Sequence, residues 1–119
     1  GGGAIGCEFA SFLVDVGTEV TILEALPQIL PGVDQQVAQT VVRGFTKRGI
    51  KVLSGVRINK LEHGDSDVVV RFDGKTGDER LIVDQVVVSV GRQPRTDGIG
   101  LEEAGVKVDE RGLSLRMKD

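Results

Sequence analysis

The sequence is poor in cysteine, proline and aromatic residues, and each shortage limits what the protein can be. Among its 119 residues there are one Cys and three Pro, and Trp and Tyr do not occur. A single Cys excludes an internal disulfide framework and suits a reducing compartment, so we expect a bacterial cytoplasm or a mitochondrial matrix. With only four Phe, the core must be built from aliphatic side chains.

Long apolar runs and a one-sided charge are also missing. No apolar stretch approaches the roughly 20 residues that span a bilayer, and no signal peptide is visible. Lys and Arg together number 15 against 18 Asp and Glu, and the net charge is −3. The basic residues form no stripe, so we expect neither nucleic acid nor a membrane as a partner. The length predicts one domain over residues 1–119.

Helical and strand patterns alternate in the first half of the chain. One helix is expected over Ile5–Val16 and ends at Gly17. The short β-branched run Glu19–Glu24 predicts a buried strand, and residues 25–33 read as a loop. Asp34 is a suitable N-cap for a second helix to about Arg48. The apolar faces expected for the two helices are Ile5, Phe9, Phe12, Leu13 and Val16, and then Val37, Val41 and Phe45.

Short strands dominate the second half. Ile50–Leu53 and Gln85–Val90 have the apolar pattern of buried strands. Between them, turn signals at residues 63–65 and 73–75 predict an antiparallel meander. Its expected strands are Arg57–Leu61, Val68–Phe72 and Arg80–Val83. The tail predicts a helical turn near Leu101–Ala104 and two short extended pieces, Val106–Val108 and Leu113–Leu115. The order indicates an α/β fold with an antiparallel insertion.

Glycine, with 17 residues, is abundant, and its densest group opens the chain. Gly1-Gly2-Gly3-Ala4-Ile5-Gly6 fits the dinucleotide-binding pattern G-x-G-x-x-G and leads directly into the first helix. Gly1 would permit a tight turn, Gly3 would let a pyrophosphate approach the backbone, and Gly6 would let the helix pack closely on the sheet. The free N–H groups of the helix would then bind the phosphates. Glycine-rich turns before helices are common, so the pattern alone is weak.

Glu24 strengthens this interpretation. It ends a predicted strand 18 residues after Gly6, close to the offset at which such folds carry a ribose-binding carboxylate. A carboxylate there accepts hydrogen bonds from the ribose hydroxyls of NAD and repels the additional phosphate of NADP. Residues 25–27 are Ala, Leu and Pro, so no cation follows it. The alternative is a carboxylate that is merely solvated at a strand end.

The pattern should follow a strand, whereas here the sequence begins at its first glycine. We therefore expect a Rossmann-like parallel sheet with an antiparallel β-meander insertion, from which the first strand is missing. Either the chain is part of a longer protein, or a partner supplies that strand. An inert structural fragment is a third possibility. Unpaired sheet edges promote association, so we expect the isolated chain to dimerise.

Several motifs in order resemble the dihydrolipoamide dehydrogenases of the FAD-dependent pyridine nucleotide-disulfide oxidoreductase family. They are Gly1–Phe9, Val20–Glu24, Ile29–Asp34, Phe45–Ile50 and Val88–Pro94, and the tail from Glu103 to Gly112 continues the match. Mercuric reductases and other NAD-linked relatives share most of these motifs. The resemblance implies a flavoprotein in which electrons pass from a dithiol through an active-site disulfide and FAD to NAD. This chain would be its NAD(H)-binding domain, and the FAD and interface domains would lie elsewhere.

The same resemblance assigns a role to each cofactor-binding candidate. The glycine segment with Cys7, Glu8 and Phe9 would lie along the pyrophosphate and the nicotinamide side. Glu24 would bind the ribose, Ile58 would contact the adenine, and Gly91 would admit the nicotinamide ribose. Core packing for Ile58 and a simple helix-start carboxylate for Glu8 are the alternatives. The full set is Gly1, Gly2, Gly3, Ala4, Ile5, Gly6, Cys7, Glu8, Phe9, Glu24, Ile58 and Gly91.

The catalytic parts of that family are not expected in this chain. Its redox pair is two cysteines, whereas Cys7 stands alone and reads as a small buried hydrophobe, with a reactive thiol as the alternative. His63, the one histidine, falls at a predicted turn and should be solvated. We expect no catalytic residue and no metal site. A standalone nucleotide-binding module without turnover is the competing hypothesis.

Overall fold

A computed structural model describes residues 1–95, 97–107, 109 and 110 of the chain. Its helices and strands follow the order predicted up to residue 83. They are α1 (Ala4–Asp15), β1 (Thr21–Glu24), α2 (Gln35–Lys47), β2 (Lys51–Ser54), β3 (Arg57–His63), β4 (Val68–Gly74) and β5 (Gly77–Val83).

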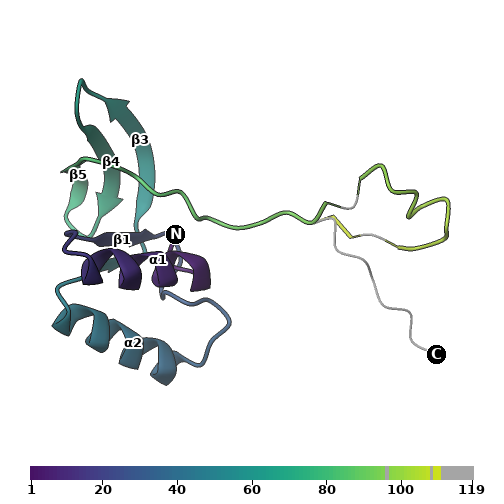
Figure 1. Cartoon of the computed structure of the whole chain (residues 1–119), viewed down its shortest axis with the longest axis horizontal. Coiled ribbons are helices and arrows are strands. Elements are labelled where there is room, and N and C mark those ends of the chain that lie inside the picture. Colours follow the sequence, from purple (N-terminus) through teal and green to yellow (C-terminus); the bar gives the residue numbers. More distant parts are fainter. Residues whose placement is uncertain (96, 108, 111–119) are drawn as a thin grey trace.

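These elements form three layers, with the two helices on one side of a small parallel sheet and the antiparallel meander on the other (Figure 1). β1 and β2 pair in parallel, from Thr21 opposite Lys51 to Glu24 opposite Ser54. Because side chains alternate along a strand, β1 supplies both layers. Ile22 joins the core under the helices, and Leu23 packs against the core under the meander. The expected α/β class is confirmed.

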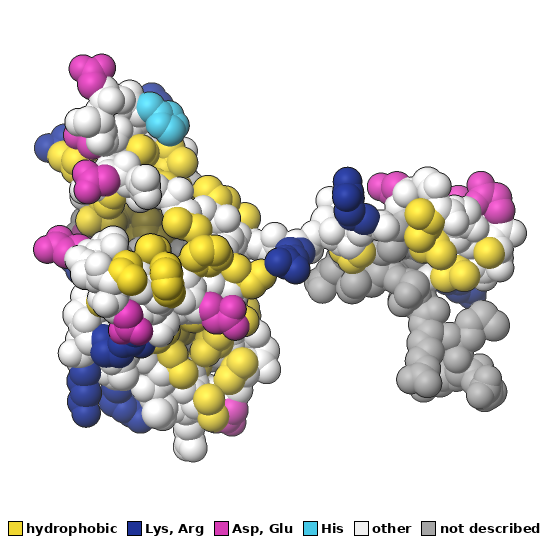
Figure 2. Space-filling view, viewed as in Figure 1, with side chains coloured by type: hydrophobic (Ala, Val, Ile, Leu, Met, Phe, Trp, Pro, Cys, Tyr) yellow, Lys and Arg dark blue, Asp and Glu magenta, His cyan; other side chains and the backbone are white. Residues whose placement is uncertain are grey.

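Helix α1 lies where the pattern predicted it, but its buried face is the opposite one. Cys7 and Ala10 are buried, and Val14 packs against the same core. Four of the five residues of the expected stripe are exposed, with Phe12 63% and Val16 61% accessible, and Leu13 is half-buried. The buried side chains, Cys7 and Ala10, are small, so the helix can approach β1 closely. A helix that is apolar on two sides can bury only one side against a two-stranded sheet. Hydrophobic side chains therefore gather on the surface over α1 (Figure 2).

Helix α2 begins and ends as predicted. The Asp34 carboxylate accepts hydrogen bonds from the backbone N–H of Gln36 at 2.9 Å and of Val37 at 3.3 Å, which satisfies two of the free amides of the first turn. Phe45 is buried and Val41 packs against the core, as expected, whereas Val37 is exposed. In this first turn the neighbouring Ala38 is the buried residue.

The meander forms one sheet in the order β3-β4-β5. The last hairpin is tighter than predicted, because β4 pairs with β5 as far as Gly74 opposite Gly77. His63 is the last residue of β3 and not part of a turn, and it is exposed as expected. Glu62 of β3 accepts a hydrogen bond from Arg71 across the ladder at 3.2 Å. That bond and the Arg71 charge lower the pKa of the Glu62 carboxyl below its ordinary value.

The strand predicted at Gln85–Val90 does not form. Residues 84–95 form an extended segment that passes the N-terminus at Ser89 and then leaves the packed layers (Figure 1). Strand assignment requires a hydrogen-bonded neighbour, and among the described residues none pairs with this segment. Val88 is 70% exposed and Val90 79%. The segment does pass Gly1, where an added Cβ would overlap the carbonyl of Ser89.

Beyond this segment, the helical turn near Leu101 is confirmed. The N–H of Ala104 donates to the Gly100 carbonyl at 3.0 Å, and that of Val106 to the Leu101 carbonyl at 2.9 Å. Val106 and Lys107 are not in a strand, and Val108 and the expected piece Leu113–Leu115 lie outside the described residues. In the part of the chain that the structure describes, no helix has the length and apolarity to cross a membrane.

Candidate functional site

The glycine segment forms an open N-terminus for α1. Gly3 is the N-cap residue, and no side chain caps the helix. The first backbone bond of the helix runs from the N–H of Cys7 to the Gly3 carbonyl at 3.0 Å. The backbone N–H groups of Ala4, Ile5 and Gly6, which come before Cys7 in the first turn, have no acceptor within the helix. Since Ala4 and Ile5 are exposed, these amides can bind an anionic group such as a phosphate.

The glycines of the motif are required for different reasons. A Cβ on Gly6 would overlap the carbonyl oxygen of Gly1, so Gly6 permits the loop to fold against the helix start. The sequence interpretation had assigned Gly6 to close packing of the helix on the sheet. A Cβ on Gly2 would lie 2.7 Å from Cγ2 of Ile29. Nothing lies within 4 Å of a Cβ placed on Gly3, so that position faces open space from which a phosphate can approach.

The Glu24 carboxylate reaches the glycine segment directly. Its Oε1 accepts a hydrogen bond from the Gly2 N–H at 3.0 Å, and its Oε2 accepts one from the Leu26 N–H at 3.0 Å. Two residues 22 positions apart in sequence therefore meet at one point. A carboxylate has about four acceptor positions, so capacity remains for two ribose hydroxyls. Among the described residues no Lys or Arg pairs with it.

Cys7 lies behind the glycine segment. It is buried, and its Sγ donates to the Gly2 carbonyl oxygen at 3.4 Å. Burial raises the pKa of the thiol, the nearby Glu24 carboxylate raises it further, and the amino terminus lowers it. A raised pKa keeps the sulfur protonated and unreactive. The structure thus favours the small buried hydrophobe over the reactive thiol.

No hydrogen bond or ion pair given for the described residues joins the remaining candidates to this point. Glu8 and Phe9 are exposed on the second turn of α1. Ile58 is exposed near the start of β3, and the preceding connection is tied to the end of β1, since the Val56 N–H donates to the Glu24 carbonyl at 3.1 Å. Gly91 has a φ of 144° and lies two residues after Ser89, the residue beside Gly1.

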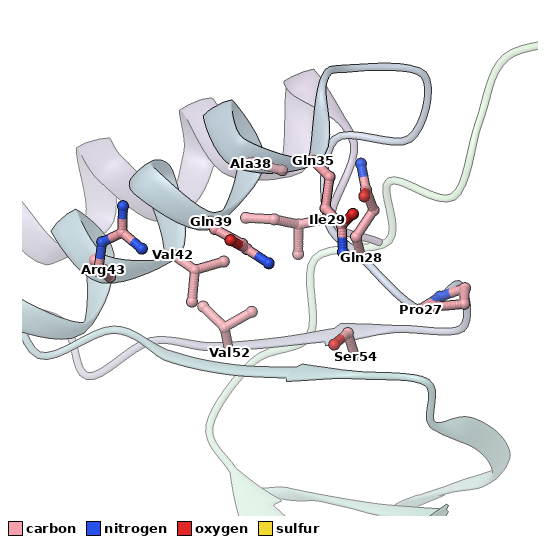
Figure 3. Close-up of a pocket in the computed structure, with 10 residues that line it drawn as sticks. All are labelled: Pro27, Gln28, Ile29, Gln35, Ala38, Gln39, Val42, Arg43, Val52 and Ser54. Atoms are coloured by element: carbon pink, nitrogen blue, oxygen red, sulfur yellow. The ribbon is translucent and has the colours of Figure 1, made fainter.

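Sequence reasoning missed two contacts of the β1–α2 loop. Ile29 packs under Gly2, and the Leu30 N–H donates to the Gly2 carbonyl oxygen at 2.7 Å. It also missed a cavity of about 320 Å³ between α2, the loop and β2. Figure 3 shows Gln28 and Ile29 at its loop side, Gln39 and Arg43 on α2, and Ser54 at the end of β2. The two contacts and the cavity depend on the conformation of the β1–α2 loop. The spacing of apolar residues in the sequence does not indicate that conformation.

This arrangement can hold a nucleotide through backbone amides and one carboxylate. Within the described ranges, no group of three or more His, Cys, Asp or Glu side chains could hold a metal ion. At the glycine segment the pKa of the Cys7 thiol is raised by burial, and the Glu24 carboxylate is engaged with backbone amides.

Comparison with known proteins gives one consistent result. The family model described as pyridine nucleotide-disulphide oxidoreductase matches residues 1–115. The chain is 42% identical over 115 residues to a dihydrolipoyl dehydrogenase of Thermus scotoductus, covering 95% of this chain and 25% of the relative. It is 40% identical over 113 residues to that of Staphylococcus aureus, covering 95% and 24%. The chain thus spans about a quarter of the length of these curated relatives.

A solved structure supports the same assignment. The Cu(II) complex of the HOCl-induced flavoprotein disulfide reductase RclA from Escherichia coli superposes with a TM-score of 0.78 at 34% identity. The match covers 97% of this chain and 25% of that one. The layered arrangement of Figure 1 is therefore shared with a flavoprotein disulfide reductase.

Proposed function

Because the chain belongs to the pyridine nucleotide-disulphide oxidoreductase family, we propose that residues 1–119 are the NAD(H)-binding domain of a dihydrolipoamide dehydrogenase. In such an enzyme, dihydrolipoamide is oxidised through an active-site disulfide and FAD, and NAD accepts the hydride. The name of the curated relatives, at 40–42% identity, supports this choice. The FAD site, the disulfide and the dimer interface belong to the rest of the longer polypeptide.

One observation carries the proposal, namely the contact between the Glu24 carboxylate and the Gly2 N–H at 3.0 Å. In a dinucleotide fold, the pyrophosphate lies at the helix N-terminus and the ribose at the acid that ends the next strand. Both features must be adjacent if one ligand is to bridge them. Their direct contact supports a single site that extends from the first turn of α1 to the end of β1.

The charge of this site favours NAD over NADP. A 2′-phosphate on the adenosine ribose would lie beside the Glu24 carboxylate, with Ala25 and Leu26 as its next neighbours. Carboxylate and phosphate repel each other, and no guanidinium or ammonium pairs with Glu24 in the described chain. Glu8 and Phe9 would then face the nicotinamide end, Ile58 the adenine and Gly91 the nicotinamide ribose.

We assign binding and orientation to this chain and no catalytic residue. The described residues around the glycine segment offer backbone amides and a carboxylate that already accepts two backbone N–H groups, and these groups would hold the cofactor. The reducing compartment that a lone buried Cys7 suits is a bacterial cytoplasm or a mitochondrial matrix.

Calorimetric titration of the chain with NADH and NADPH tests the cofactor. We expect NADH to bind about tenfold more tightly or better, which corresponds to about 1.4 kcal/mol. Glu24→Ala should weaken NADH binding, and Glu24→Gln should reduce the discrimination against NADPH because it removes the charge and keeps an acceptor. Glu19→Ala, which removes a carboxylate just before the same strand, is the matched control. Tighter binding of NADPH to the wild-type chain would overturn the proposal.

A second candidate is a flavoprotein disulfide reductase with another acceptor, such as mercuric ion or a different disulfide. The 34% identity to RclA and the TM-score of 0.78 support this second candidate. Turnover assays of the full-length protein distinguish the two candidates. NAD reduction by dihydrolipoamide supports the dehydrogenase, whereas NADH consumption with a metal ion or another disulfide alone supports the reductase. No turnover with any of them would indicate a non-catalytic nucleotide-binding module.

A further inference from the structure

Three hydrogen bonds hold the backbone N–H and carbonyl groups of Gly2. Its N–H donates to Glu24 Oε1 at 3.0 Å. Its carbonyl oxygen accepts hydrogen bonds from the Leu30 N–H at 2.7 Å and from Cys7 Sγ at 3.4 Å. Gly2 is itself buried. The middle of the glycine segment is therefore held by the end of β1, by α1 and by Leu30 of the β1–α2 loop, which lies more than 20 residues away in sequence.

Ile29 forms the apolar support of this arrangement. It is 1% exposed and belongs to the same core cluster as Cys7 and Ala10 of α1. A Cβ on Gly2 would lie 2.7 Å from Ile29 Cγ2, so the glycine backbone rests directly on this side chain. Figure 3 shows Ile29 in the space between α2 and the sheet. Gly2 cannot move toward the core while Ile29 is in place.

Leu30 holds an unfavourable backbone conformation at the same point. Its φ is 53°, and in the described chain it is the one non-glycine residue with a positive φ. A leucine in the left-handed region persists where surrounding contacts determine it, and such strain is found at functional sites. Here Gln28 Nε2 donates to the carbonyl oxygens of Leu30 at 3.3 Å and of Val33 at 3.0 Å. These bonds fix the turn that directs the Leu30 N–H at Gly2.

We infer that Gln28, Ile29 and Leu30, which we name the loop clamp, are positioning residues that hold the glycine segment in its phosphate-binding form. The inference rests on the proposed function. The clamp contacts Gly2 and not the open face at Gly3, where nothing lies within 4 Å of an added Cβ. It acts on the ligand through the backbone of the glycine segment. Loosening the clamp should weaken binding of the pyrophosphate and leave binding of the adenosine end unchanged.

Ile29→Ala and Gln28→Ala test the clamp, with NADH, ADP-ribose and adenosine as probes of the 119-residue chain. Ile29→Ala removes the support under Gly2. Gln28→Ala removes two hydrogen bonds without opening the core, so it keeps the test valid if the first variant does not fold. We expect both variants to bind NADH and ADP-ribose about five- to tenfold more weakly, the scale of one loosened hydrogen bond, with adenosine unchanged. Ile29→Val keeps most of the side chain, so it should bind NADH and ADP-ribose more tightly than Ile29→Ala does.

Gln39→Ala is the matched control, because Gln39 lines the same cavity from α2 and makes none of the clamp's contacts. Its affinities should equal those of the wild type. Unchanged NADH affinity in folded Gln28→Ala and Ile29→Ala would overturn the inference, and so would an equal loss for adenosine and ADP-ribose, which indicates a general structural effect.

Failure of the proposed function would look different, because the wild-type chain would then bind neither NADH nor ADP-ribose. Hydrogen exchange of the Gly2 and Leu30 amides, which donate to Glu24 and to the Gly2 carbonyl, tests the clamp in that case as well when it is measured by NMR without ligand. Faster exchange in the two clamp variants than in Gln39→Ala supports it, and equal exchange overturns it.

Discussion

The strand β1 and the segment 85–90 have a similar apolar, β-branched character, but only β1 forms a strand. Thr21–Glu24 and Gln85–Val90 are both short, apolar and rich in β-branched residues. β1 pairs with β2 and buries Ile22, whereas Val87, Val88 and Val90 are exposed and their segment has no ladder among the described residues. Composition makes both segments suitable for a sheet, but a hydrogen-bonded neighbour makes only one of them a strand. The candidate site lies at the end of the paired one.

Amide hydrogen exchange should give the largest contrast between these two segments. The amides of β1 and β2 exchange only when the packed layers open, whereas those of residues 86–90 are solvated. We expect protection to differ on the order of 10³-fold, as the free energy of unfolding of a small domain implies. Equal protection in both segments, measured by NMR, would mean that residues 85–90 are paired in solution and that the comparison fails.

The sequence predicts features that are encoded locally and misses features that depend on which neighbour a segment finds. The elements around the candidate site that depend on local pattern are predictable, since the strand that ends at Glu24 and the Asp34 cap are each encoded within a few positions. The buried face of α1 was predicted wrongly, because the helix is apolar on both sides and only its partners decide which side is buried. The clamp could not be predicted, because the φ of Leu30 and the contact of Ile29 with Gly2 arise from tertiary packing.

Two alanine substitutions, one in β1 and one in the segment 85–90, should differ in their effect on the free energy of unfolding. Ile22→Ala removes a buried side chain from the core under the helices, and we expect the free energy of unfolding to fall by about 2–5 kcal/mol. Val88→Ala, at a side chain that is 70% exposed, should change it by about 0.5 kcal/mol or less. Urea unfolding followed by circular dichroism measures both. A comparable loss for Val88→Ala would show that the segment is packed.

Self-association of the isolated chain should depend on the unpaired segment. Exposed valines beside free backbone N–H and C=O groups promote edge-to-edge pairing. We expect dimers in light-scattering chromatography, and Val88→Lys should raise the dimer dissociation constant by about tenfold. Gln36→Lys, at an exposed position of α2, controls for the added charge. Strictly monomeric elution of the wild type at every concentration would contradict this prediction.

The smallest effect concerns a contact that exists only because two strands pair. The hydrogen bond and charge of Arg71 lower the folded-state pKa of Glu62 below its ordinary value of 4.5. A lowered pKa stabilises the fold above that ordinary value, and the contribution is lost as pH falls through the folded pKa. Glu62→Gln should therefore slightly lower the thermal midpoint at pH 7. The difference from wild type should shrink below pH 4.5. A difference that grows in acid would contradict the assignment.

If one nucleotide bridges the start of α1 and the end of β1, its binding must perturb both places at once. Titration of the ¹⁵N-labelled chain with NADH, followed by amide chemical shifts, tests this directly. We expect the largest shifts at Gly3, Ala4, Ile5 and Gly6, together with Leu26, whose N–H donates to Glu24. Shifts confined to the cavity between α2 and β2, or no shifts at saturating NADH, would contradict it.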